Sequence, residues 1–196
     1  SLQGGAGNDN LSGGKGHDNM TGDDGNDLLH GNEGYNQLYG GLGNDTLRGD
    51  YMGYYDGGDG NDSLVGGIHT DQMYGGLGND KLYGGVGDDR LSDTQGSDLL
   101  DAGAGNDQVD ISYNEGRDTL RGGAGEDRLV LTYLTGNFIA KPAGQVLTIA
   151  GGTTITGFEH YNISTTGEQG NVITTLGGND TISGGFGNDK LTGGGG

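Results

Sequence analysis

Single apolar residues recur along the chain every nine residues, each after a glycine-rich loop sequence. The stretch GGLGNDTLR at 40–48 returns as GGLGNDKLY at 75–83 and as GGFGNDKLT at 184–192. The eighth residue of each unit is apolar, whereas the seventh and ninth are mostly polar. In an extended segment this alternation puts the eighth side chain on one face and its neighbours on the other. Each unit is therefore predicted to be a six-residue loop followed by a three-residue strand.

Sixteen units of this kind lie within 4–130 and 166–192. Their eighth residue is always Leu, Ile, Val or Met, and their sixth is Asp except at Asn36 and Asn171. Because one unit cannot bury its single apolar side chain, two units are expected to form a coil, and successive coils to stack through parallel strands about 4.8 Å apart. We therefore predict an all-β chain, a right-handed parallel β-roll (solenoid) with two nonapeptide repeats per coil and roughly eight coils.

The extent of the repeat divides the chain into three regions. Residues 1–130 are the main roll with an insertion near 49–58, 131–165 are a β segment that continues or caps the solenoid, and 166–196 are a second short repeat block. Within 131–165, two β-branched runs flank two glycines, Gly151 and Gly152, so a hairpin and further coils are both open. We favour coils, because the repeats on either side need stacking partners. Both chain ends resemble incomplete units, so we expect a piece of a longer protein.

Composition changes this picture by adding a large uncompensated charge. Of the 196 residues, 49 are Gly and none is Cys. The chain has 28 acidic and 9 basic residues, which gives a formal net charge of −19. Such a balance argues against nucleic acid and anionic membranes as partners, and the lack of Cys excludes thiol catalysis. No apolar run is long enough to span a membrane. With 29% hydrophobic residues the chain resembles disordered sequences, so we expect a cation to order it.

Stacked coils would bring the carboxylates of alternate units into line. Asp9 is expected beside Asp27, and Asp62 beside Asp80 on the other side of the roll. Without a cation this ladder of like charges is destabilising. Ca²⁺ accepts 6–8 oxygen ligands from carboxylates and backbone carbonyls, and glycine loops present their carbonyls without side-chain obstruction. Residues 131–158 contain no Asp or Glu, so carboxylate-based binding is expected to stop there.

The tandem motif G-G-x-G-x-D-x-U-x, where U is an apolar residue, resembles the repeats-in-toxin (RTX) family of calcium-binding parallel β-rolls. The resemblance implies about ten Ca²⁺ ions as cofactors, held by carboxylates and loop carbonyls. The implied carboxylate ligands are Asp9, Asp18, Asp27, Asp45, Asp62, Asp71, Asp80, Asp89, Asp98, Asp107, Asp118, Asp127, Asp180 and Asp189. The implied carbonyl ligands include those of Gly4, Gly5, Gly7, Gly22, Gly25, Gly40, Gly41, Gly43, Gly75, Gly76, Gly78, Gly84, Gly85, Gly87, Gly184, Gly185 and Gly187.

Several units depart from the motif. Asn36 and Asn171 each offer one neutral amide oxygen, so we expect weaker or empty sites there. GGIHTD has His69 where a glycine is usual, and DTQGSD and YNEGRD lack the first glycine pair. Because of these departures, the loops of Asp71, Asp98 and Asp118 differ from the regular loops.

For function, the resemblance implies a secreted, extracellular calcium-binding module of a larger protein. Family members are exported unfolded by bacterial type I secretion and fold where calcium is plentiful, so the module would serve as a structural and secretion-assisting scaffold. Its partners would be calcium and the remainder of the parent protein. We expect no enzymatic activity, because the four histidines are scattered and have no partnered nucleophile.

Two alternatives remain open. The first is an adhesion or glycan-binding module that uses 131–165 or the insertion, whose Tyr51, Tyr54 and Tyr55 are expected at a loop tip. The second is the C-terminal part of an RTX enzyme whose catalytic domain is absent. Six further aromatic residues are expected to have structural roles. Tyr39, Tyr74 and Tyr83 are expected to make cross-strand contacts, and Phe138, Phe158 and Tyr161 to pack in the core.

Overall fold

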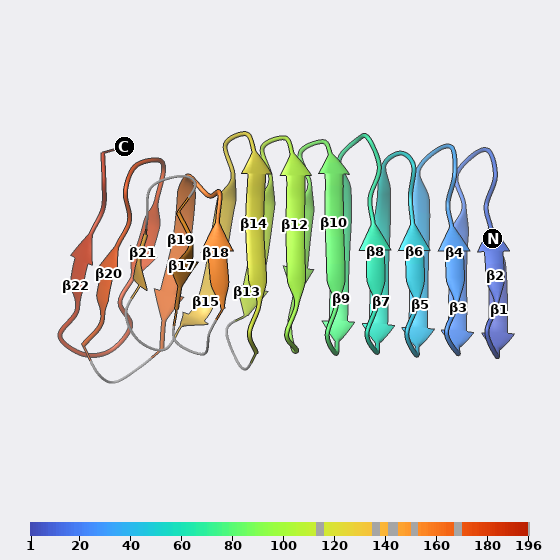
Figure 1. The fold of residues 1–196 in the computed structure, drawn as a ribbon, viewed down its shortest axis with the longest axis horizontal. Coiled ribbons are helices and arrows are strands. Elements are labelled where there is room, and N and C mark those ends of the chain that lie inside the picture. The colour runs from blue at the N-terminus through green and yellow to red at the C-terminus, as the bar shows by residue number, and fades with distance from the viewer. Residues whose placement is uncertain (113–115, 135–137, 141–144, 150–152, 167–169, 196) are drawn as a thin grey trace.

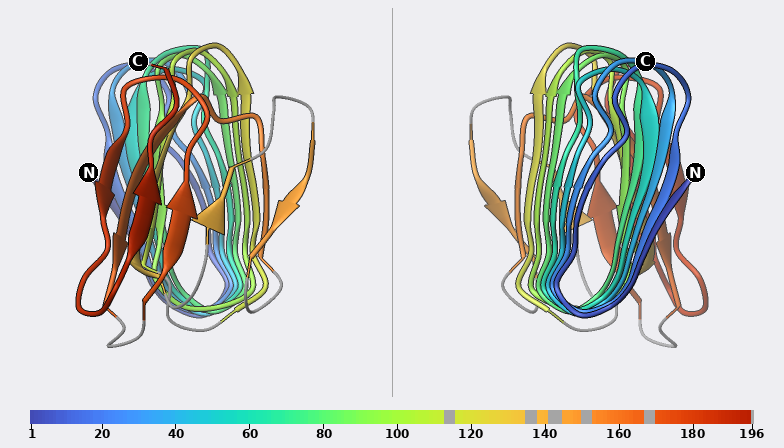
Figure 2. Two further views of the ribbon diagram at one scale, coloured as in Figure 1. Left: turned by 90° about the vertical axis from the view of Figure 1, so that its left-hand side faces the viewer. Right: turned by 90° about the vertical axis from the view of Figure 1, so that its right-hand side faces the viewer.

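The chain forms a parallel β-solenoid in which each turn crosses from one sheet to the other and back (Figure 1). The computed structural model describes residues 1–112, 116–134, 138–140, 145–149, 153–166 and 170–195, and the described residues include no helix. Viewed along its length the molecule is a flattened tube with its two main sheets face to face (Figure 2). This is the all-β roll that the repeat predicts.

The larger sheet has ten strands, so the solenoid has about ten turns rather than the eight expected. The additional length comes from a half-turn at 49–56 and from 131–165, both of which the repeat count left out. In spatial order its strands are β1 (Leu2–Ala6), β3 (Asn19–Asp24), β5 (Asn36–Leu42), β7 (Gly53–Asp59), β9 (Asp71–Leu77), β11 (Arg90–Asp93), β13 (Gln108–Ser112), β15 (Arg128–Leu134), β19 (His160–Thr165) and β21 (Thr181–Ser183).

The facing sheet has nine strands, and three further strands form a small sheet near the C-terminus. The nine are β2 (Asn10–Ser12), β4 (Leu28–His30), β6 (Thr46–Arg48), β8 (Ser63–Val65), β10 (Lys81–Val86), β12 (Leu99–Ala104), β14 (Thr119–Ala124), β18 (Thr154–Thr156) and β17 (Leu147–Thr148). The three are β16 (Phe138–Ile139), β20 (Val172–Thr174) and β22 (Lys190–Thr192). Several strands of both main sheets extend beyond the predicted three residues into the loop glycines, as in the pairing of Gly41 with Gly58.

The core is a double row of position-8 side chains between the sheets. In β6, for example, Leu47 is buried while Thr46 and Arg48 are exposed, as the alternation predicts. Met20, Leu29 and the equivalent residues through Leu129 are fully buried. Leu191 lies in β22, an edge strand of the small sheet, and is 45% exposed. Phe138, Phe158 and Tyr161 are also buried, which confirms the core role expected for them.

The segment 131–165 combines both arrangements that the sequence left open. β18 and β19 join the two main sheets through parallel pairing with β14 and β15, so the solenoid continues. β17 pairs antiparallel with β18, and the Ile149 N–H donates to the Thr153 carbonyl, so a hairpin is present as well. The proposed Gly151–Gly152 turn lies outside the described residues.

Candidate calcium sites

The position-6 residues form two columns, one in the loops along each long edge of the roll (Figure 1). The backbone N–H of each residue in a column donates to the side-chain Oδ1 of the residue one turn further on, over 2.7–3.1 Å, except at Asn36, at Gly53 and at the last residue of each column. The first column contains Asp9, Asp27, Asp45, Asp62, Asp80, Asp98 and Asp118. The second column contains Asp18, Asn36, Gly53, Asp71, Asp89, Asp107 and Asp127.

The placement of Asp62 corrects one prediction. It was expected on the opposite side of the roll from Asp9 and Asp27, but the Asp45 N–H donates to its Oδ1 over 2.7 Å, so it lies in the first column. The reason is that residues 49–56 are not an insertion looping out of the roll. They form a complete half-turn one residue shorter than the others, and this preserves the alternation between edges.

The second carboxylate oxygen, Oδ2, is the atom that points to a cation. Among the described residues, buried Oδ2 atoms without any hydrogen-bond partner belong to Asp9, Asp18, Asp27, Asp45, Asp62, Asp80, Asp89, Asp93, Asp107 and Asp127. A buried carboxylate that lacks a compensating charge is costly. A repeating set of such oxygens requires either protons or cations to neutralise it.

Glycine at position 1 leaves open the space that these oxygens face. A Cβ added to Gly4 would lie 2.7 Å from Asp9 Oδ2 and 2.8 Å from the carbonyl oxygen of Gly22 in the next turn. Carboxylate and carbonyl oxygens thus converge on a site from which side chains are excluded, and Ca²⁺ prefers this donor set. The residues therefore fit the ion. It would be held by the position-6 carboxylates and position-1 carbonyls and would supply the missing positive charge.

The position-1 carbonyls are only partly those predicted. The carbonyl oxygens of Gly22, Gly40, Gly75 and Gly84 lie beside the carboxylate of the preceding turn, as expected of ligands. The same place is taken by carbonyls that the sequence analysis did not single out, those of Gly31, Gly57, Ala102 and Gly157. For Gly31, Gly57 and Ala102 a signal was available, because each is the first residue of a unit one turn beyond a position-6 Asp. Gly157 lies in 131–165, outside the repeat units, and had no such signal.

Burial raises the pKa of these carboxyl groups, with neighbouring carboxylates adding to the effect at several of them. The pKa of Asp62 rises to about 7, and backbone N–H donors oppose the shift. The pKa values of Asp89 and Asp98 also rise to about 7, and those of Asp107 and Asp127 to about 6. Without a cation these carboxyl groups therefore keep their protons to a higher pH in the folded roll than in the unfolded chain.

Asn36 and Asn171, the two amides at position 6, donate side-chain hydrogen bonds, which an ionised aspartate cannot do. The Asn36 side-chain amide donates from Nδ2 to the carbonyl oxygens of Asn32 and Gly34 in its own loop, over 3.3 and 3.4 Å. The Asn171 Nδ2 donates to Thr165 Oγ1, the Gly184 carbonyl and Asp189 Oδ1. In both loops an N–H group provides positive polarity to nearby oxygens.

The tyrosines of 49–58 do not lie together at a loop tip, which corrects that prediction. Tyr55 lies in β7 and is fully buried at the position of a core leucine, paired with Leu38. Its hydroxyl donates to Asp71 Oδ1 over 3.2 Å. Tyr54 lies on the outer face of β7, with its ring 5.6 Å from that of Tyr39 and 5.3 Å from that of Tyr74. The cross-strand role expected for Tyr39 and Tyr74 is thereby confirmed.

The loops set apart by their sequences also differ in structure. Asp71 Oδ2 accepts the Gly67 N–H and Asp118 Oδ2 accepts the Thr153 hydroxyl. Neither is among the partnerless oxygens of the described residues, and Asp98 is likewise not among them. Asp180 directly precedes β21, the strand after β19 in the larger sheet, and Asp189 directly precedes β22 of the small sheet. Their Oδ1 atoms accept the N–H groups of Tyr161 and Asn171.

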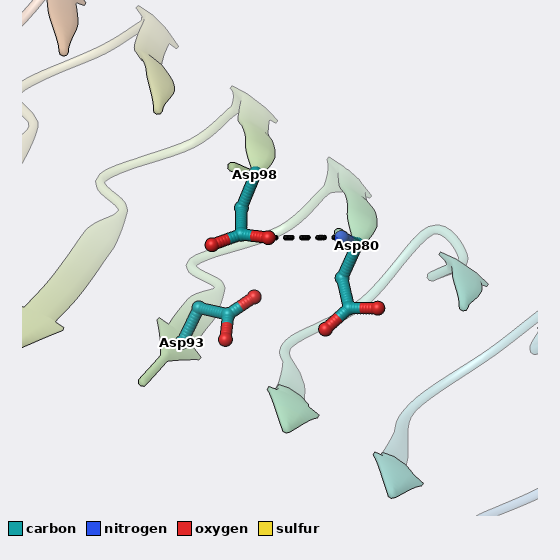
Figure 3. A group of neighbouring side chains, drawn as sticks. All are labelled: Asp80, Asp93 and Asp98. Carbon is teal, nitrogen blue, oxygen red and sulfur yellow. Dashed lines mark hydrogen bonds between the residues drawn. The ribbon is translucent and has the colours of Figure 1, made fainter. Parts of the chain in front are cut away.

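Two acidic residues that the sequence analysis did not select belong to this chemistry. Glu159 Oε2 accepts the Asp127 N–H over 2.9 Å, so it takes the place of the next Asp in the second column. Asp93 is buried and lies with Asp80 and Asp98 in one group (Figure 3). The sequence did offer a signal for Asp93: it is the first residue of DTQGSD, a position that is glycine in the regular units.

Comparison with known families agrees with this geometry. The pattern of RTX calcium-binding nonapeptide repeats matches residues 1–29, 21–50, 54–82, 83–110, 114–131 and 165–196. The chain therefore belongs to this family of structural calcium-binding repeats. Comparison with curated proteins finds no match to the chain. In the part of the chain that the structure describes, no helical segment has the length and hydropathy of a membrane span.

Proposed function

We propose that this chain is a calcium-dependent folding module of a larger secreted protein. The observation that carries the proposal is the repeating set of buried, partnerless carboxylate oxygens in a chain of net charge −19. When they are ionised and no cation is present, these groups oppose burial. The chain is then largely disordered, and calcium binding supplies the free energy of folding. Stacking of the turns makes the transition cooperative.

The module folds outside the cell and remains unfolded during export. Calcium is scarce in the cytoplasm, so the chain stays competent for export by a type I route, and millimolar external calcium then orders it. Affinities of about 10⁻⁴–10⁻³ M are typical of extracellular calcium modules and would suit this change. We propose about ten ions, a number supported by how many loops present a partnerless Oδ2.

Far-UV circular dichroism during a calcium titration tests this proposal, with magnesium as the control. We expect a cooperative gain of β signal with calcium alone, because Mg²⁺ demands a smaller octahedral site and dehydrates reluctantly. Equal β signal with and without calcium would overturn the folding mechanism.

A glycan-binding surface is a second candidate, favoured by one observation. Tyr39, Tyr54 and Tyr74 form consecutive ring contacts on the outer face of the larger sheet, and flat aromatic surfaces stack on sugars. Replacing Tyr54 and Tyr74 with Ala should then abolish retention on a glycan array while leaving calcium-dependent folding intact. Retention that survives both substitutions would remove this candidate.

A further inference from the structure

Two successive loops of the first column bring three carboxylates together. Asp80 precedes β10, Asp93 ends β11 and Asp98 precedes β12, and one oxygen of each lies within 4.8 Å of the other two. Figure 3 shows the three carboxyl groups facing one another across a small gap. All three residues are buried, with Asp80 and Asp93 only 1% and 3% exposed.

Asp93 occupies the place that a carbonyl oxygen has in the regular sites. Beside Gly57, the open space is bordered by Asp62 Oδ2 and the Gly75 carbonyl oxygen. Beside Gly75, one turn further on, it is bordered by Asp80 Oδ2 and Asp93 Oδ2. A carboxylate has thus replaced a neutral carbonyl at this site.

Nothing in the described protein neutralises this group. The Oδ2 atoms of Asp80 and Asp93 are buried and have no hydrogen-bond partner. No ion pair among the described residues includes Asp80, Asp93 or Asp98. The hydrogen bonds that the group receives come from backbone N–H groups, such as that of Thr94 to Asp93 Oδ1. Two buried, partnerless oxygens directed into one gap need a proton or a cation to neutralise them, and the three carboxylates offer a cation the charged oxygen ligands that Ca²⁺ prefers.

We infer that Asp80, Asp93 and Asp98 form the highest-affinity cation site of the roll, which fills at a lower calcium concentration than the others. Calcium affinity in oxygen sites rises with the number of charged ligands, and the attraction of a cation scales with the charge that surrounds it. The inference rests on the proposed function, because it assigns an order of filling to the same sites. The site lies at the fifth and sixth of the seven positions in the first column, so turns lie on both sides of it and its occupancy would order them.

Calcium binding to the full chain, measured by competition with a chromophoric chelator, tests the inference. We expect one ion to bind at least about tenfold more tightly than the rest. Asp93→Asn and Asp93→Gly should each remove that single tight step and leave the weaker steps in place. Asp93→Gly restores the regular loop sequence, and Asp93→Asn keeps the side-chain shape. The matched control is Asp59→Asn, which removes the same charge from an exposed residue at the end of β7 and should keep the tight step.

The outcomes separate this inference from the proposed function. Circular dichroism at saturating calcium establishes that each variant folds. If the wild-type chain shows no calcium-dependent folding, the proposed function fails. If it folds with calcium, but the Asp93→Asn isotherm superimposes on the wild-type isotherm or shows tighter binding, this inference is overturned while the proposed function stands. Loss of the tight step in Asp59→Asn as well would also overturn it, because the effect would then be one of net charge.

Terbium provides a second readout that a purely structural role of Asp93 would not move. A trivalent ion gains more than a divalent ion from an added carboxylate, because the interaction energy is proportional to the product of the charges. The site between Asp80 and Asp98 should therefore prefer Tb³⁺ over Ca²⁺ less strongly in Asp93→Asn than in the wild-type chain. An unchanged preference would contradict the assignment of Asp93 as a ligand.

Discussion

The two columns of the roll differ although the same repeat builds both. The first column carries an aspartate in every turn from Asp9 to Asp118, each linked to the next by a hydrogen bond. The second column is interrupted after Asp18 by Asn36 and then by Gly53. At these two turns the loop is filled by the Asn36 amide and by the Tyr55 hydroxyl, which lies where a Cβ on Gly49 or Gly53 would be.

This difference indicates that each loop of the roll needs either a group that provides positive polarity or a group that fills the open space. Calcium is one of several groups that can meet this need. The Asn36 amide directs N–H donors at the loop carbonyls. The Tyr55 hydroxyl donates to Asp71 and occupies the open space of its own loop. The N-terminal half of the second column should therefore depend less on calcium than the facing half of the first.

The largest effect should come from breaking the first column. In Asp62→Ala the chain loses a carboxylate that faces the open space and the acceptor of the Asp45 N–H. We expect the calcium midpoint of folding to rise at least about tenfold. Asn36→Ala should shift the midpoint far less, because no carboxylate is lost. Calcium titrations followed by circular dichroism compare the two variants, and equal shifts would contradict the distinction between the columns.

Protons should partly replace calcium in both columns. The pKa values of Asp62 and Asp89 in the folded roll are about 7, above the ordinary 3.8. The ion-free folded form thus binds more protons than the unfolded chain between these values, and its stability falls as pH rises through this range. In chelator, β signal should therefore increase from about pH 8 to about pH 5. A signal that stays flat or decreases over this range would rule out burial of these carboxyl groups as the barrier to folding.

Asn36→Asp should convert an amide-filled loop into a calcium loop. The buried amide donors are lost and a carboxylate is added, so we expect one additional bound ion and lower stability in chelator. Ion stoichiometry from isothermal titration and folding in chelator measure the two effects. The matched control is Asn26→Asp, which adds the same charge at an exposed loop residue and should leave the stoichiometry unchanged.

Tyr55→Phe should give the smallest effect and sharpen the comparison inside the second column. The ring remains in the core, but the hydroxyl that donates to Asp71 is lost. At saturating calcium we expect a loss of about 1–2 kcal/mol in the free energy of unfolding, measured by denaturant titration. Tyr54→Phe, on the outer face of the same strand, serves as the reference. A larger loss in Tyr54→Phe than in Tyr55→Phe would mean that the hydroxyl does not fill the loop.

Several features of the site could be predicted from the sequence because they repeat. The register of Asp9, Asp27 and Asp45, and the inward position of Leu47, each follow from one local unit and the need to stack it. The second role of the position-5 asparagines could not be predicted in this way. The side chains of Asn8, Asn26 and Asn44 accept the backbone N–H of the residue one turn further on, whereas their sequence pattern indicates only turn preference.

The nine-residue spacing by itself determined the β-roll, the double row of apolar residues and the alignment of carboxylates between turns. These follow from short-range periodicity, since each unit has one apolar side chain and one way to bury it. Only the tertiary structure decided which edge Asp62 occupies, because an eight-residue half-turn at 49–56 looks like an insertion until its strand pairs with its neighbours. The tertiary structure also brought Asp93 to Asp80 and Asp98. Contacts between turns depend on the loop path, which a single irregular unit leaves open until its neighbours hold it.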